Sequence, residues 1–163
     1  MAPQTSETTS NRVIIQSLSA EFARLYSLWR SLIGSCEVDL IYTQPELGRD
    51  RILPSIGESV LRSAAAVEQI FGGLTAGLWD DPFEWTLPET LTTPQLILEY
   101  LAEVDATRER AFQSFKSDQD LSTLISLPSG ETQTLATLLL QTLLRACLFQ
   151  GQASVTARLL SSL

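Results

Sequence analysis

The side chains that could do chemistry are unevenly supplied in this sequence. Its 163 residues contain no histidine, which is the commonest metal ligand and the usual general base near neutral pH. Without an imidazole, the chain cannot activate a serine or cysteine nucleophile in the usual way or build a histidine-based metal site. The remaining candidates are arginines set among apolar residues, two cysteines and scattered carboxylates.

Four segments with a helical repeat of apolar residues must position these groups. They run from about residue 13 to 36, 55 to 77, 93 to 116 and 132 to the end, and each places its apolar residues three and four apart. Ser55 and Thr93 are typical N-cap residues for the second and third helices. We therefore expect an all-α four-helix bundle, with residues 37–54 as a long crossover after the first helix.

Composition narrows the classes of function. The chain is 44% hydrophobic and has a net charge of −8, which predicts an acidic globular protein that avoids nucleic acid and anionic membranes. No apolar run approaches the roughly 20 residues of a membrane span. Residues 1–11 read as a disordered or frayed N-terminus and residues 12–163 as one domain. Cys36 and Cys147 lie in apolar helical patterns, which favours two buried free thiols in a reducing cytoplasm.

Two stretches of the sequence stand out as motifs. The stretch from Ser55 to Arg62 reads SIGESVLR, and the stretch from Leu144 to Gln152 reads LRACLFQGQ. Both resemble motifs of the DinB/YfiT-like family. Family members bind a divalent metal through one histidine of the second helix and two of the last, and several are thiol-dependent transferases or isomerases. The corresponding positions here are Arg62, Arg145 and Phe149. Neither a protonated guanidinium nor a phenyl ring binds a metal, so we expect no metal and no cofactor.

The resemblance implies that Arg62 and Arg145 point into the same end of the bundle, with Phe149 beside them. Arg108 also lies on an apolar stripe, and a buried guanidinium needs a partner. Three arrangements are open. Glu58, Glu68, Glu99 or Glu103 neutralises the arginines as an ionic plug, the arginines bind a small anion, or they reach solvent. The ligand-binding candidates are Arg62, Arg145, Phe149, Gln152 and Arg108.

Two functions follow from these alternatives. The first is a DinB-like protein without the metal site that has a non-catalytic, ligand-binding or interaction role. The second is a metal-free, thiol-dependent transferase whose arginine-lined pocket binds an anionic small molecule. By analogy with the family we also expect a homodimer formed through exposed apolar residues such as Leu28, Leu138 and Leu148. The aromatic residues from Trp79 to Trp85 read as a lid over one end of the bundle.

Overall fold

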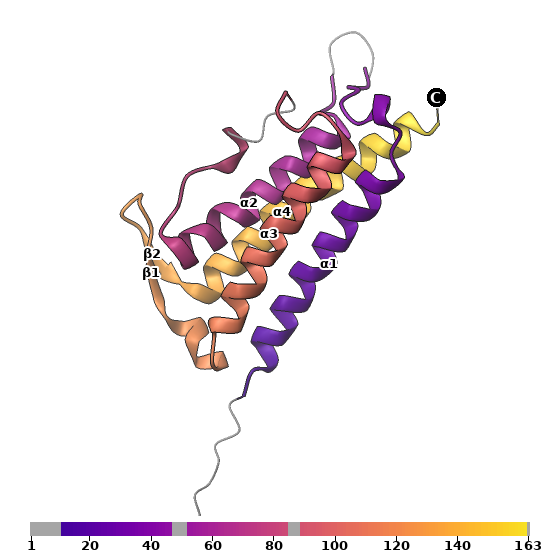
Figure 1. Cartoon of the computed structure of the whole chain (residues 1–163). Coiled ribbons are helices and arrows are strands. Elements are labelled where there is room, and N and C mark those ends of the chain that lie inside the picture. Colours follow the sequence, from indigo (N-terminus) through magenta and orange to yellow (C-terminus); the bar gives the residue numbers. More distant parts are fainter. Residues whose placement is uncertain (1–10, 47–51, 85–88, 163) are drawn as a thin grey trace, which may run out of the picture.

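A computed structural model of the chain describes residues 11–46, 52–84 and 89–162, and it is a four-helix bundle (Figure 1). The long helices are α1 (Val13–Ser35), α2 (Ile56–Ala76), α3 (Pro94–Ser114) and α4 (Leu135–Leu160). Three short 3-10 turns, η1 (Val38–Leu40), η2 (Pro82–Glu84) and η3 (Asp118–Ser122), lie in the connections. The predicted all-α bundle is confirmed.

Side-chain caps begin the helices where the sequence predicts them. The Ser55 hydroxyl accepts a hydrogen bond from the Glu58 amide at 3.1 Å, and the Thr93 hydroxyl accepts one from the Leu96 amide at 3.3 Å. The Glu58 carboxylate binds Arg62 one turn along the helix. Gly77 ends α2 with a φ of 70°, in the left-handed region where glycine meets no steric penalty.

The direction of the helices differs from the expectation of a crossover after α1. The described parts of the connection between α1 and α2 stay at one end of the bundle, where the Gly57 amide donates to the Ile41 carbonyl at 2.8 Å. Helices α2 and α3 run parallel, so the chain returns along the bundle between Gly77 and Thr93 (Figure 1). The order is therefore up, down, down, up, and the lengthwise crossover follows the second helix.

The described part of that crossover lies along α2 and does not close an end of the bundle. A Cβ atom on Gly73 would stand 2.3 Å from the Trp79 ring, so glycine is what lets this indole lie against the helix. The Gln69 side-chain amide donates to the Trp79 carbonyl at 3.0 Å, and the Phe83 ring lies over Arg62. The predicted lid is thus wrong for Trp79 and Phe83, and Trp85 falls outside the described residues.

A small hairpin precedes α4, and its second strand occupies residues 132–134, where the apolar repeat predicted the start of the fourth helix. Strands β1 (Leu124–Ser126) and β2 (Thr132–Thr134) pair antiparallel, with Ile125 opposite Gln133. At three residues each, the strands are too short to show an alternation of apolar and polar side chains.

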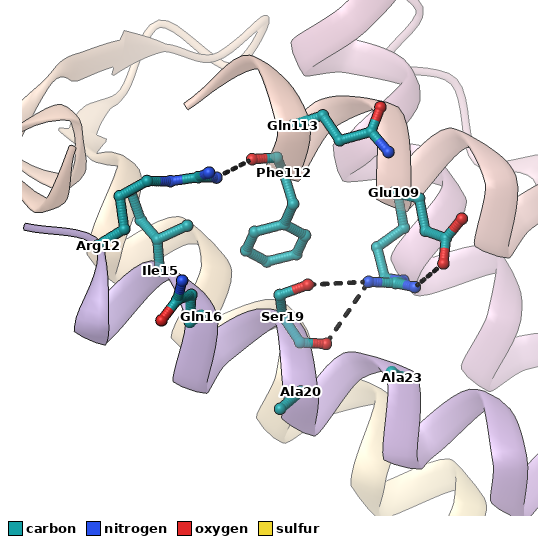
Figure 2. Close-up of a pocket in the computed structure, with 10 residues that line it drawn as sticks. Arg12, Ile15, Gln16, Ser19, Ala20, Ala23, Glu109, Phe112 and Gln113 are labelled. Carbon is teal, nitrogen blue, oxygen red and sulfur yellow. Dashed lines mark hydrogen bonds and ion pairs between the residues drawn. The ribbon is translucent and has the colours of Figure 1, made fainter. Parts of the chain in front are cut away.

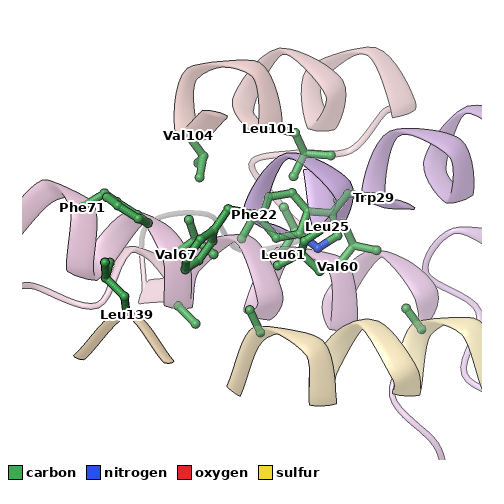
Figure 3. Packing of buried hydrophobic residues seen from close by; sticks show 14 of the residues in the cluster. Phe22, Leu25, Trp29, Val60, Leu61, Val67, Phe71, Leu101, Val104 and Leu139 are labelled. Carbon is green, nitrogen blue, oxygen red and sulfur yellow. The ribbon is translucent and has the colours of Figure 1, made fainter. Parts of the chain in front are cut away.

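The core lies along the bundle axis and draws on all four helices (Figure 3). Three phenylalanines, Phe22, Phe71 and Phe112, pack with ring centroids 5.1 to 5.7 Å apart, a separation that favours edge-to-face contact. Beside them the Trp29 indole donates to the Ser63 hydroxyl at 2.8 Å, and that hydroxyl donates to the Ala146 carbonyl at 2.7 Å. This polar chain joins α1, α2 and α4 inside the core.

Two further predictions can be compared with the described residues, one about the N-terminus and one about membrane-spanning helices. Of residues 1–11 only Asn11 is described, and its carbonyl accepts a hydrogen bond from the Asp118 amide at 2.9 Å. That residue is consequently tied to the bundle. Across the described ranges, no helix has the length and apolarity needed to cross a bilayer.

Candidate functional site

The structure separates the five predicted ligand-binding residues, and Arg108 is the most deeply placed of them. Only 4% of its side chain is exposed. Its Nε donates to Asp105 at 2.8 Å, and one terminal nitrogen donates to Glu109 at 3.3 Å. The other terminal nitrogen donates to the Ser19 hydroxyl at 3.2 Å, across the α1–α3 contact (Figure 2). Two carboxylates therefore neutralise this buried cation.

Arg62 lies at the edge of the bundle and not in its interior. Its guanidinium donates to the Glu58 carboxylate at 3.1 Å, and 42% of the side chain is exposed. The guanidinium carbon stands 4.0 Å from the centre of the Phe83 ring, within the range of a cation–π contact. The expected pairing of an arginine with Glu58 is confirmed here, but the burial is not.

The other three candidates lie on α4 and are more accessible than predicted. Arg145 and Gln152 are exposed, and Phe149 is half-buried. Arg145 lines a shallow pocket beside Ala66, Ile70 and Thr142, in which Arg62 takes no part. The prediction that Arg145 points into the core is wrong because its neighbour Ala146 holds the core-facing position, at 0% exposure.

Two buried polar atoms between α2 and α4 were missed by sequence reasoning. The Ser59 hydroxyl and the Gln150 side-chain carbonyl have no hydrogen-bond partner within the described residues. Ser59 is 0% and Gln150 6% exposed. The hydrogen bond from Ser63 to Ala146 fixes which residues of α2 and α4 lie side by side. Ser59 lies one turn before Ser63 and Gln150 lies one turn after Ala146, so in these antiparallel helices they lie at the same level. A signal was present in the sequence, because Ser55, Ser59 and Ser63 repeat every four residues on one face of α2.

The outward face of α4 is apolar, and we call it the α4 face. It consists of Leu140, Leu144, Leu148 and Val155, whose exposures are 50%, 67%, 73% and 51%. These residues repeat every four or seven positions, so they share one side of the helix. Leu28 on α1 is also exposed, at 45%, as expected, whereas Leu138 is 2% exposed and belongs to the core. The naming of Leu138 as a surface residue is therefore wrong.

Neither thiol has the surroundings of a reactive cysteine. Both are unpaired; Cys36 is partly buried and Cys147 is exposed, so the prediction of two buried thiols is wrong. Burial raises the pKa of the Cys36 thiol, with a further contribution from the Glu37 charge. Partial desolvation of the sulfur also raises the pKa of Cys147. The charge of Glu21 raises this pKa further, and the charge of Arg24 lowers it by less. A raised pKa lowers the thiolate fraction and the nucleophilicity of both groups at neutral pH.

Carboxylates and thiols do not gather into a metal-binding group. Across the parts of the chain that the structure describes, no three histidine, cysteine, aspartate or glutamate side chains come together in a way that could hold an ion. The most perturbed carboxyl is Glu68, which accepts a hydrogen bond from the Tyr100 hydroxyl at 2.5 Å. Burial raises its pKa, the Tyr100 hydrogen bond opposes this, and the Glu103 charge adds to the rise.

Comparisons with known proteins bear on the fold alone. No protein-family model matches the chain, and no curated protein matches it. Among solved structures, a crystal structure of a conserved protein from Enterococcus faecalis superposes with a TM-score of 0.69 and 18% sequence identity. The match covers 92% of this chain and 98% of that one. The bundle is therefore a fold that already occurs in a known bacterial protein.

Proposed function

We propose that this chain is a DinB-like protein that has lost the family's metal site and serves as a non-catalytic interaction module, a homodimer formed through the α4 face. The observation that carries the proposal is that α4 is apolar on both sides. Leu139, Ala146 and Ala153 face the core at 0% exposure, while the α4 face carries three leucines and a valine into solvent. A helix with two apolar sides is normally covered on both of them.

The charge distribution favours a second copy of this chain as the cover. The protein carries a net charge of −8, yet residues 135–160 contain no aspartate or glutamate and two arginines. Two copies would repel each other over most of their surfaces, but this repulsion is weakest where α4 meets α4. The same apolar stripe on both copies is self-complementary about a two-fold axis, as a symmetric dimer requires.

Gly151 offers a place for the two helices to cross. It lies between Leu148 and Val155 on the outward side of α4, and a Cβ added to it would meet nothing within 4 Å. Glycine inside a helix costs about 1 kcal/mol relative to alanine, and no contact within the described chain requires it there. A close approach by the partner's backbone would give this glycine a function.

The non-catalytic part of the proposal is supported by the ion pairs of two candidate arginines. Arg62 is paired with Glu58, and Arg108 is paired with Asp105 and Glu109, so both already have counter-ions. The transferase alternative needs a pocket shared by Arg62 and Arg145, and the pocket at Arg145 does not reach Arg62. The two unpaired cysteines support a cytoplasmic location.

Leu144→Glu tests the dimer and has a closely matched control in Leu124→Glu. Both leucines are 67% exposed, but Leu124 lies in β1, away from the α4 face. Molar mass would be measured by light scattering after size exclusion, over a hundredfold range of protein concentration. We expect a dimer for the wild type and for Leu124→Glu, and a monomer for Leu144→Glu, because a partly buried carboxylate at the interface is costly.

Two results would overturn the proposal. The first is a wild-type monomer at every concentration. The second is a dimer that Leu144→Glu leaves intact while circular dichroism shows an unchanged fold, since the interface would then lie elsewhere.

A further inference from the structure

A separate pocket lies between the start of α1 and the second half of α3, on a different side of the bundle from the α4 face. Its volume is about 420 Å³, and it opens to solvent between the two helices. Figure 2 shows the Phe112 ring between Arg12 at one end and Ser19 with Glu109 at the other. Ile15 and Phe112, which are 1% and 4% exposed, form its apolar floor. The pocket is therefore apolar in the middle and polar at both ends.

The two arginines of this pocket differ in their partners. Arg108 is neutralised by Asp105 and Glu109. Arg12 forms one hydrogen bond, from a terminal nitrogen to the Phe112 carbonyl at 2.9 Å, and its Nε is buried without a partner in the described structure. None of the described carboxylates comes within ion-pair distance of it. Within the part of the chain that the structure describes, Arg12 is therefore the arginine of the pocket without a counter-ion.

Asp118, the acid at the start of α1, is occupied by backbone amides. The two oxygens of Asp118 accept the backbone amides of Ile14 and Ile15 at 3.1 and 3.0 Å, which is the usual role of an acid at a helix N-terminus. The Arg12 guanidinium is held in place by its bond to Phe112, and its remaining donors are left for an anion. A carboxylate matches the planar fork of a guanidinium.

The spacing along α1 sets the size of the ligand. Arg12 and Ser19 are seven residues apart, which is about 10 Å along a helix. Between them the pocket presents the Phe112 ring, and Ala20 and Ala23 line the pocket beyond Ser19 on α1 (Figure 2). A ligand with one charged end and an apolar body of this length would cover the floor, while a second negative charge would meet Glu109.

We propose that this pocket binds a small monocarboxylate with an aliphatic or aromatic body. The carboxylate accepts hydrogen bonds from the terminal nitrogens of Arg12, and the body packs on Phe112. Binding here needs neither the dimer nor any catalytic activity, so it stands apart from the proposed function.

Octanoate is a suitable probe, with octanamide as the uncharged analogue of the same length. Each would be titrated into the labelled full-length protein while backbone amide shifts are followed by NMR. We expect octanoate to shift amides of residues 12–23 and 108–113, and octanamide to bind at least about tenfold more weakly, because it lacks the charge-assisted contact.

Two variants and one control locate the site. Arg12→Gln keeps a polar side chain but removes the charge and the guanidinium, and should weaken octanoate binding about tenfold or more. Ala20→Phe fills the mouth of the pocket without touching Arg12, and should abolish binding. Arg24→Gln is the control, because Arg24 lies on the same helix with 72% of its side chain exposed. The proposal fails if octanoate does not bind at millimolar concentration, or if Ala20→Phe and Arg12→Gln, both folded, bind it as the wild type does.

Discussion

The contacts of α3 with α1 and with α2 each hold an ionisable side chain, which is buried in the first contact and partly buried in the second. Against α1, the Arg108 guanidinium has two carboxylate partners and a hydroxyl. Against α2, the Glu68 carboxyl has a hydroxyl, from Tyr100, and a second acid, Glu103, close enough to raise its pKa. The positive charge of Arg108 is thus balanced by carboxylates at the α1–α3 contact, whereas no cation balances Glu68 among the interactions just described. Removing each charge should therefore have opposite consequences for stability.

Arg108→Ala should give the largest effect. It would leave Asp105, whose side chain is 14% exposed, without its counter-ion and would remove the packing of the arginine stem. We expect the free energy of unfolding to fall by about 3 kcal/mol. Urea denaturation followed by circular dichroism would measure this. Arg24→Ala, an exposed arginine on α1, should change it by less than about 0.5 kcal/mol. A loss at Arg108 no larger than at Arg24 would remove the distinction between the two sides.

Glu68→Gln should change how stability depends on pH. The pKa of Glu68 is raised in the folded protein, so the folded state binds more protons than the unfolded state between the unfolded pKa and the raised folded one. Stability contributed by the protonated acid is therefore lost as pH rises through that window. Glutamine still accepts the Tyr100 hydrogen bond and does not titrate.

The comparison requires urea denaturation of both proteins at several pH values from 4 to 8. Relative to the wild type, Glu68→Gln should gain stability as the pH increases through the window. If the free energies of unfolding of the two proteins change in parallel with pH, Glu68 has the same pKa in the folded and unfolded states. The contrast between Glu68 and Arg108 would then be wrong.

The smallest effects are expected at the edge of the bundle. Arg62→Ala removes an exposed ion pair and the contact with Phe83, and should cost about 0.5–1 kcal/mol. Arg145→Ala should cost less than about 0.5 kcal/mol, because Arg145 is exposed and has no ion-pair partner in the described ranges. Thermal unfolding of both variants would rank them. A loss of several kcal/mol at Arg145 would restore the ionic plug that the sequence suggested.

The helices could be predicted from the sequence because local signals agree there. Ser55 and Thr93 cap the helices they were expected to cap, and the stripe from Ile56 to Phe71 is buried throughout. The position of Arg108 on an apolar stripe also predicted its burial correctly. In each case the residues that decide the outcome lie within a few turns of one another.

The site could not be predicted in the same way. Arg12 acquires its role from the Phe112 carbonyl, 100 residues away, and no local pattern contains that contact. On α4 the difficulty is different. Leucines surround the helix, so the sequence does not tell which side faces the core, and both Leu138 and Arg145 were assigned to the wrong side. The crossover was misplaced because a long loop shows its length but not its direction.

The parallel course of α1 and α4 has a consequence for rearranging the chain. Helix α1 begins at one end of the bundle and α4, with 26 residues, ends at the other (Figure 1), a separation of about 39 Å if the helix is straight. A circular permutant joining these two points would need a bridge of at least about 12 extended residues. Tandem fusion of two copies does not require such a bridge along the bundle. The end of α4 in one copy would be joined to the start of α1 in the next, and this arrangement favours an extended rod.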